Sequence, residues 1–295
     1  MWKEEWNVVI REIWCYFSPV VSKREVADWQ EELKESFSGK LLVLTTINQL
    51  ISYEGEANQE RQAGIFLVTD SKAFYEAAYK KKIPFLLYLH DGNKKESFQN
   101  VPFATTGLSG VDYDYMEKIY KRFFGIPWTI LTTKRCIVRE FTEDDLDELY
   151  DLYADPSISR YTEGLYPDRE QEQRYIRDYI EQVYKICGFG IWAVISRETG
   201  KLIGRAGIAW REGYDTPELG YVIGVPYQRK GIASEVCSRI LEFAREGLGF
   251  EKIRVLFLKE NKASLGLCRK LGFQKDGNVD IDGRQMQQYI YIGEA

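Results

Sequence analysis

The residues best placed to do chemistry in this chain form a basic turn at residues 228–233, between a β-branched run and an amphipathic helical pattern. The first N–H groups of a helix lack internal partners, and together with the helix dipole they attract anions. Gly231 and Ala233 keep bulky side chains away from the backbone, and Arg229 and Lys230 add positive charge. The pattern predicts a phosphate-binding turn, although a plain strand-to-helix turn explains this segment equally well when it is taken alone.

Sequence patterns in this turn and around it resemble those of a known superfamily. Gln228, Gly231 and Ala233 fill the fixed positions of Gln/Arg-x-x-Gly-x-Gly/Ala, and the segment resembles the pyrophosphate loop of the GNAT acetyltransferases. Four further segments resemble the branch that acetylates the N-termini of ribosomal proteins: Arg139 to Asp155-Pro156, Glu218-Leu219-Gly220-Tyr221, Asn261-Lys262-Ala263-Ser264 and Lys270-Leu271-Gly272-Phe273. The resemblance extends over residues 134–292 in the right order.

The resemblance implies that acetyl-CoA is the cofactor and that a primary amine attacks its thioester directly in a ternary complex. It also implies that the strand before the turn offers a backbone N–H to the oxyanion and pairs with the pantetheine arm. The cofactor-binding residues implied in this way are Tyr221, Val222, Ile223, Gln228, Arg229, Lys230, Gly231, Ile232, Ala233, Ser234 and Asn261.

Two proton transfers need residues of their own. Glu218 is the expected base, directly or through water; a surface carboxylate without a role is the alternative, and an amine that arrives neutral needs no base. Many relatives place a tyrosine in the last helix as the acid, but here that position holds Cys268, so Ser264 or a water is the expected acid. Asn261 precedes a helix, so Asn261 and Ser264 have simple helix capping as an alternative role.

The acceptor amine is expected to meet the loop at residues 157–166 and the helix that follows. Tyr161, Glu163 and Tyr166 are the predicted substrate-binding residues, because acids attract a protonated amine and aromatic rings can stack on its stem or on a peptide. Ordinary solvated loop charges are the alternative. The loop is compatible with a protein N-terminus or with a small amine such as a polyamine or an amino sugar.

The composition of the chain argues against several other classes of ligand and site. The 295-residue chain has a formal net charge of −5 and no dense basic stripe, which argues against nucleic acid. Five scattered cysteines without CxxC spacing indicate free thiols in a reducing compartment. His90 is the only histidine, so the C-terminal half can hold neither a His-based metal site nor a Ser-His-Asp triad, and no metal is predicted.

The N-terminus lacks the pattern of a signal peptide, and no apolar run is long enough to span a membrane. We therefore expect a cytoplasmic protein that binds neither nucleic acid nor membranes, and the oligomeric state stays open.

The elements that must position these residues fall into two domains, 1–128 and 129–295, as the chain length suggests. The first is predicted to be a parallel α/β domain that begins with two helices. Short apolar runs in this domain are typical of strands buried on both faces. The predicted helices are 2–17, 22–37, 71–82 and 113–124, and the predicted strands are 41–44, 64–68 and 84–89.

The second domain is predicted to be a GNAT α+β domain with a mixed sheet. Its expected strands are 135–141, 189–196, 202–210, 218–225, 252–258 and 287–292, and its expected helices follow residue 142 and span 168–184, 231–245 and 262–271.

The N-terminal domain carries acids at the ends of predicted strands, where α/β sheets bind ligands. Asp70 and Asp91 are the residues concerned. The domain loosely resembles haloacid-dehalogenase-like or receiver-like folds, but Leu44-Thr45-Thr46 offers no carboxylate where the first of these carries Asp-x-Asp. We expect a degenerate, noncatalytic domain. The competing functions are phosphate handling by Asp70 or Asp91, and a GNAT domain that only senses acetyl-CoA.

Overall fold

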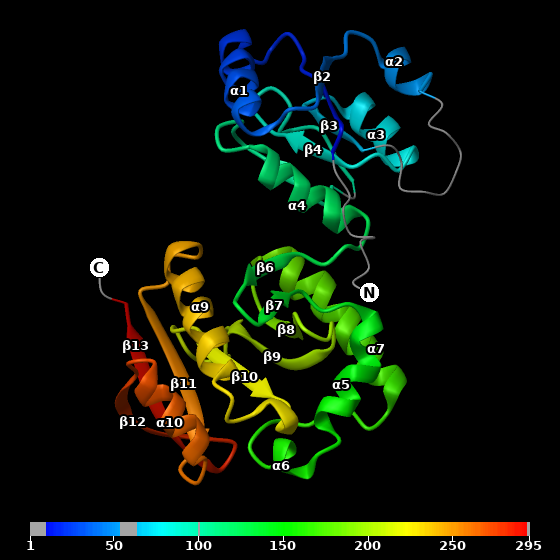
Figure 1. Cartoon of the computed structure of the whole chain (residues 1–295). Coiled ribbons are helices and arrows are strands. Elements are labelled where there is room, and N and C mark those ends of the chain that lie inside the picture. Colours follow the sequence, from blue (N-terminus) through cyan, green and yellow to red (C-terminus); the bar gives the residue numbers. More distant parts are fainter. Residues whose placement is uncertain (1–9, 54–63, 100, 294–295) are drawn as a thin grey trace. The chain divides into compact units, whose positions relative to one another are not determined.

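The computed structural model describes residues 10–53, 64–99 and 101–293. The chain forms two compact units, Met1–Trp128 and Thr129–Ala295 (Figure 1). Among the described residues, no helix is long and apolar enough to cross a membrane.

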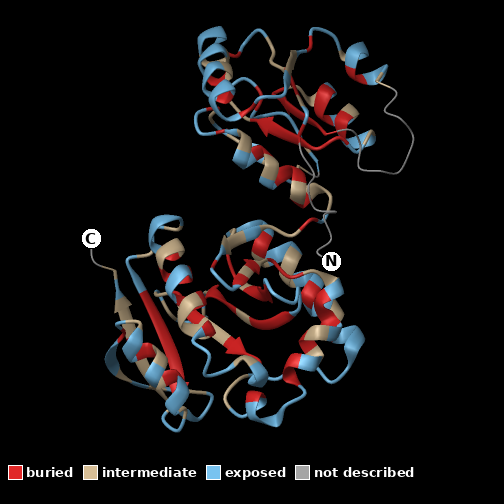
Figure 2. Ribbon diagram, viewed as in Figure 1, coloured by how far each residue is buried: buried red, intermediate tan, exposed pale blue. Residues whose placement is uncertain are grey.

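The N-terminal unit is built on a five-stranded sheet in the order β2-β1-β3-β4-β5, and every neighbouring pair is parallel. β3 and β4 are buried along their whole length, as their continuous apolar runs predict (Figure 2). The parallel α/β prediction is therefore confirmed. The strands are β1 (Glu12–Tyr16), β2 (Lys40–Val43), β3 (Ile65–Thr69), β4 (Phe85–Tyr88) and β5 (Ala104–Thr105).

Helices cover both faces of this sheet, because alternate side chains of each strand point to opposite faces. Cys15 and Val68 share one apolar core with α1 and α4, whereas Trp14 and Leu67 share the other with α2 and α3. Ser22 caps α1 by accepting from the Glu25 N–H, as the capping pattern predicts. The helices are α1 (Lys23–Ser36), α2 (Ile47–Ile51), α3 (Lys72–Lys80) and α4 (Tyr113–Phe123).

The helix predicted over residues 2–17 is wrong where the structure describes it. Residues 12–16 form β1, which lies between β2 and β3, and residues 1–9 fall outside the described part. Ile13 and Cys15 are fully buried on one face while Trp14 is buried on the other. The apolar residues there fit the period of two of a strand, and the parallel neighbours on both sides supply its backbone hydrogen bonds.

The C-terminal unit carries an eight-stranded mixed sheet in the order β12-β13-β11-β10-β9-β8-β7-β6. All neighbouring pairs are antiparallel except β10 and β11. The mixed-sheet prediction is confirmed, although the sequence patterns missed β6 and β12. The strands are β6 (Thr129–Thr132), β7 (Cys136–Arg139), β8 (Ile191–Ser196), β9 (Leu202–Ala209), β10 (Glu218–Ile223), β11 (Lys252–Leu258), β12 (Gln274–Ile281) and β13 (Arg284–Ile292).

Two helices of this unit follow the neighbouring strands β10 and β11. α9 (Ile232–Glu246) follows β10 through the basic turn, and α10 (Lys262–Lys270) follows β11. The remaining helices are α5 (Leu146–Tyr153), α6 (Pro156–Ser159), α7 (Arg169–Asp178), a π-helical segment (Tyr179–Tyr184) and α8 (Lys185–Cys187).

Candidate active site

β10 and β11 separate almost as soon as they meet. Their parallel pairing consists of Glu218 opposite Arg254, next to a hydrogen bond from the Arg254 N–H to the Pro217 carbonyl (2.9 Å). β10 continues to Ile223 with β9 on its other side only, and the two strands diverge toward their carboxyl ends (Figure 1). The outer edge of β10 beyond Glu218 is therefore without a strand partner in the described part of the chain, and an extended ligand could pair with it.

The turn after β10 contains two residues with left-handed backbone conformation. Arg229 has φ 59° and Gly231 has φ 77°. Gln228 braces the turn by donating from Nε2 to the Ile223 carbonyl (2.9 Å). Gly231 is the N-cap of α9 and supplies no side chain to the first-turn N–H groups. These N–H groups are therefore available to an anion.

The space beside Gly231 is open except for one guanidinium group. A Cβ built on this glycine would meet only the Arg135 Nη2, at 3.6 Å. No other described atom lies within 4 Å of that position, so a ligand can approach the backbone of Gly231 closely. The donors present, backbone N–H groups with arginine and lysine, are those that hold phosphate oxygens.

Tyr221 extends from β10 toward α10. Its hydroxyl is buried and has no hydrogen-bond partner of normal geometry among the described residues, while Ser264 and Cys268 of α10 lie close enough to affect its titration. Burial, followed by the nearby Cys268, raises the pKa of Tyr221. Burial also raises the pKa of Cys268 to about 12. Both groups hold their protons at neutral pH, so either can donate a proton but neither can accept one.

Asn261 acts as the N-cap of α10. Its Oδ1 accepts from the Ser264 N–H (3.0 Å), which is the capping role that the sequence left open. The Ser264 side chain is buried, and the hydroxyl of Tyr221 faces it. The structure therefore brings Tyr221, Ser264 and Cys268 together, with Asn261 fixing the start of the helix that carries two of them.

Glu218 lies where β10 and β11 part, and both of its oxygens contact Arg211. Arg211 donates from Nε (2.6 Å) and from Nη2 (3.3 Å), and Arg254 Nε lies 3.9 Å away. The hydrogen bond with Glu218 raises the pKa of Arg211; burial opposes this, and the charges of Glu218 and Glu163 add to it. An amine that approaches Glu218 must therefore share the carboxylate with a charged guanidinium.

Arg254 is almost fully buried, and its Nε and Nη2 have no hydrogen-bond partner among the described residues. Its guanidinium stacks on the ring of Tyr214, 3.5 Å from the centroid. Sequence patterns missed Arg211 and Arg254, because the ion pairs join strands and loops that are brought together only by the sheet.

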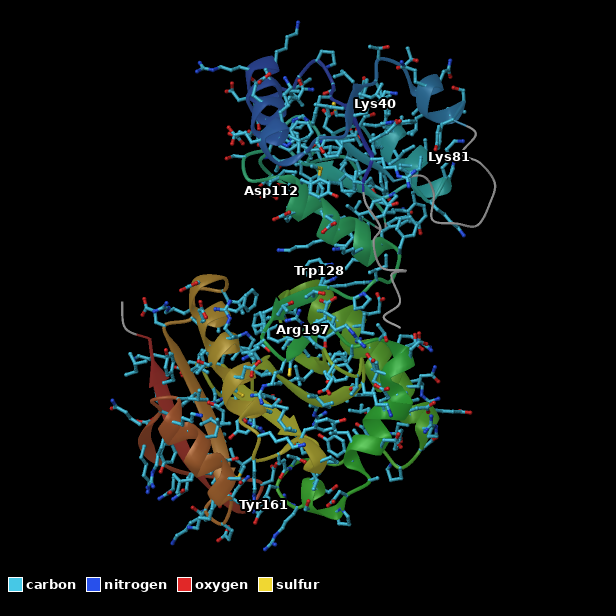
Figure 3. All side chains as sticks on the ribbon, viewed as in Figure 1. Lys40, Lys81, Asp112, Trp128, Tyr161 and Arg197 are labelled. Atoms are coloured by element: carbon cyan, nitrogen blue, oxygen red, sulfur yellow. The ribbon has the colours of Figure 1, made fainter. Side chains whose placement is uncertain are left out.

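The predicted acceptor residues lie on the segment between α6 and α7. Tyr161 stands next to Arg160, whose guanidinium lies 5.3 Å from its ring (Figure 3). The Tyr166 N–H donates to Glu172 (2.8 Å), and its exposed ring meets Tyr175 edge-on. Glu163 is exposed, and its charge contributes to the raised pKa of Arg211, the residue that binds Glu218.

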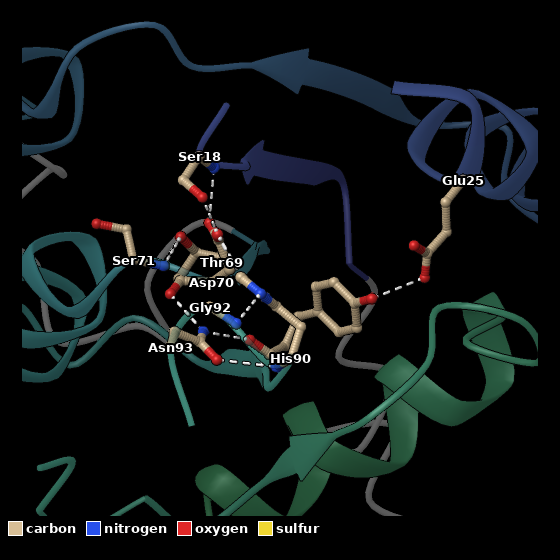
Figure 4. Close-up of polar contacts among 9 residues, drawn as sticks. Ser18, Glu25, Thr69, Asp70, Ser71, His90, Gly92 and Asn93 are labelled. Carbon is tan, nitrogen blue, oxygen red and sulfur yellow. Dashed lines mark hydrogen bonds and ion pairs between the residues drawn. The ribbon is translucent and has the colours of Figure 1, made fainter. Parts of the chain in front are cut away.

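One of the strand-end acids of the N-terminal unit, Asp70, is already engaged by the chain (Figure 4). Asp70, after β3, accepts from the Ser18 N–H (2.8 Å), the Ser18 hydroxyl and His90 Nε2 (3.0 Å), and its carboxylate is almost fully buried. Asn93 donates to the Asp70 and Tyr88 carbonyls (2.8 and 2.9 Å). These bonds tie together the carboxyl ends of β1, β3 and β4.

Asp91 is fully exposed and pairs with Lys94 (2.6 Å). The hydrogen bond from Lys94 lowers the pKa of Asp91. Neither Asp70 nor Asp91 thus presents a free carboxylate in a sheltered site.

Comparison with known proteins addresses the C-terminal unit. Residues 135–274 match the family described as "Acetyltransferase (GNAT) domain". The uncharacterized N-acetyltransferase YoaA of Bacillus subtilis is 31% identical over 165 residues, which cover 55% of this chain and 88% of YoaA. The [ribosomal protein uS5]-alanine N-acetyltransferase of Escherichia coli is 25% identical over 171 residues, 54% of this chain and 87% of that protein.

Among solved structures, the ribosomal L7/L12 α-N-protein acetyltransferase RimL in complex with coenzyme A superposes with a TM-score of 0.48. It shares 14% sequence identity, and the superposition covers 56% of this chain and 98% of that one. The family match leaves residues 1–134 and 275–295 outside the matched range.

Proposed function

Since the chain belongs to the GNAT family of N-acetyltransferases, which take their acetyl group from acetyl-CoA, we propose that its acceptor is the primary amine of a protein N-terminus or of a small molecule. The relative from Escherichia coli acts on the alanine of a ribosomal protein, which supports a protein N-terminus. The acids and aromatic rings of residues 161–166 are compatible with either class.

One observation carries the proposed donor site: β10 has an open edge that runs directly into a turn with exposed helix N–H groups. In this proposal the turn from Gln228 to Ser234 holds the diphosphate, and the backbone of Tyr221, Val222 and Ile223 lies along the pantetheine. Acetyl-CoA, when bound, supplies an acetyl group activated as a thioester. The contribution of the protein is to hold it in reach of the amine.

Proton transfer is assigned to two places at the β10 strand. Glu218, oriented by Arg211, accepts the proton of the attacking amine. On the α10 side, the buried Tyr221 hydroxyl, which lies near Ser264 and is protonated at neutral pH as tyrosines ordinarily are, supplies a proton to the departing sulfur. Tyr221 thus takes the role that the residue at position 268, a cysteine, cannot fill in the usual way.

Replacing Gly231 by glutamate tests the donor site. The new carboxylate would occupy the anion site, and losing charge-assisted hydrogen bonds worth about 1.5–3 kcal/mol each should weaken acetyl-CoA binding by about 100-fold or more. Gly231→Ala is the matched control, since it shares the strain of φ 77° but adds only a methyl group, which meets Arg135 at van der Waals distance. Calorimetry measures both affinities. Unchanged affinity in a folded Gly231→Glu protein contradicts the assignment.

For the N-terminal unit we propose a noncatalytic role. The buried Asp70 is saturated by donors of the chain itself, and the exposed Asp91 forms a surface ion pair with Lys94. The likeness to haloacid-dehalogenase-like or receiver-like folds stays a prediction.

A further inference from the structure

We propose that Arg135, which lies outside the phosphate turn, is a positioning residue of the donor site: it fixes the Lys230–Gly231 peptide so that the N–H groups of the turn face the diphosphate. The inference rests on the proposed binding of acetyl-CoA.

Arg135 connects the β6–β7 hairpin to both sides of the turn. Its Nη1 donates to the Lys230 carbonyl (2.7 Å), and its Nε donates to Glu235 Oε2 (2.7 Å). The backbone N–H of Arg135 donates to the other oxygen of Glu235 (2.9 Å). One guanidinium therefore links the last peptide of the turn to the first turn of α9.

Holding that carbonyl also determines where the neighbouring N–H points. A trans peptide is planar, with its C=O and N–H on opposite sides. Because the Lys230 carbonyl points to Arg135, the Gly231 N–H points away from it. The residues on either side of Lys230, Arg229 and Gly231, have left-handed backbone, and Gly231 in particular can rotate freely in the absence of a restraint. Arg135 supplies that restraint.

Glu235 is charged at neutral pH, so its ion pair with Arg135 is present there. Burial raises the pKa of Glu235, but hydrogen bonds from Thr133 and Arg135 and the charge of Arg135 together bring it below its ordinary value of 4.5. The pairing is therefore fully present above pH 4.5 and is lost as the pH falls through the lowered pKa. Nη2 of Arg135 lies beside Gly231, 3.6 Å from where a Cβ of that residue would stand.

Arg197 offers a matched control. Its Nη1 donates to the Thr133 and Lys134 carbonyls (both 3.2 Å), so it braces the same hairpin, and within the described part of the chain it makes no hydrogen bond or ion pair with the turn. The Arg197→Gln variant therefore shows how far weakening the hairpin alone changes the dissociation constant of CoA.

The experiment measures the dissociation constants of CoA and of pantetheine, which lacks the diphosphate, by calorimetry on the full chain. Wild type is compared with Arg135→Gln, Glu235→Gln and Arg197→Gln, each checked for folding by thermal unfolding. We expect Arg135→Gln to weaken CoA binding by about tenfold or more and to leave pantetheine binding unchanged. Glu235→Gln, which keeps its shape, should show a smaller loss of the same kind, and Arg197→Gln should show none.

The outcomes separate this inference from the proposed function. Wild-type affinity for CoA in a folded Arg135→Gln protein overturns the role of Arg135 while the donor site stands. An equal loss for CoA and pantetheine, or an equal loss in Arg197→Gln, also overturns it, because the effect would then be one of general structure. A wild-type protein that binds no CoA overturns the proposed function itself.

Discussion

At the residue scale, the proposed proton transfers depend on two side chains of β10, Glu218 and Tyr221. Glu218 is held by Arg211, and the Tyr221 hydroxyl is buried beside Ser264 without a partner among the described residues. Sequence patterns predicted catalytic roles for Glu218 and Ser264, and these stay predictions. They did not reveal Arg211, and they suggested only a backbone role for Tyr221. The reason is that side chains of β10 and α10 come together only through the packing of the folded unit.

Removing single groups separates the two proton transfers. Tyr221→Phe deletes one hydroxyl and should lower kcat by about 100-fold, with little change in the dissociation constant of acetyl-CoA. Glu218→Gln keeps the shape of the side chain and should lower kcat by a similar factor. The measurement is the pH profile of kcat for wild type and both variants. A Tyr221→Phe profile that coincides with wild type would transfer the acid role to Ser264 or to a water.

At the element scale, each unit has one defining feature of its sheet. In the C-terminal unit β10 diverges from β11, and in the N-terminal unit β1 lies between β2 and β3. The parallel runs, the meander and α9 followed from local periodicity. The position of β1 did not, because aromatic residues spaced along 2–17 satisfy a helical period as well, and only the tertiary contacts of Ile13 and Cys15 with both neighbouring strands distinguish the two.

The strand assignment predicts a large effect of truncating Ile13. Its side chain is fully buried in the core shared with α1 and α4, so Ile13→Ala should cost about 2–5 kcal/mol. Val43→Ala, in the edge strand β2, is the control, because Val43 is 59% exposed and should cost under about 0.5 kcal/mol. Hydrogen exchange of peptides from residues 64–99 measures the loss in this unit. Equal protection in the two variants would argue against a central β1.

At the scale of the whole molecule, one unit carries the chemistry of a known family and the other is unassigned. The sequence was sufficient to identify the first, because a short turn with fixed glycine and alanine positions is read from the chain directly. The role of the second could not be read in this way: its strand-end acids are visible in the sequence, but their saturation by Ser18 and His90 appears only in the folded protein.

A noncatalytic N-terminal unit predicts a stability effect without an activity effect. Asp70→Asn places an amide among donors that need an acceptor, so it should destabilise this unit by about 1–3 kcal/mol. Acetyl transfer by the full chain should keep its kcat/KM under conditions where the variant is folded. The same samples are assayed with Mg²⁺ and a generic phosphate monoester. Phosphate release by wild type that Asp70→Asn abolishes would establish the phosphate-handling alternative instead.

The most direct measurement is the release of CoA thiol from acetyl-CoA by the full chain, with a panel of acceptors that includes peptides with free N-termini, polyamines and aminoglycosides. Mass spectrometry of each acceptor follows the acetyl group. We predict that at least one primary amine raises thiol release above background, gains one acetyl group, and loses both effects with Gly231→Glu. A wild-type protein that binds acetyl-CoA but acetylates no amine in the panel would contradict a transferase and favour an acetyl-CoA sensor.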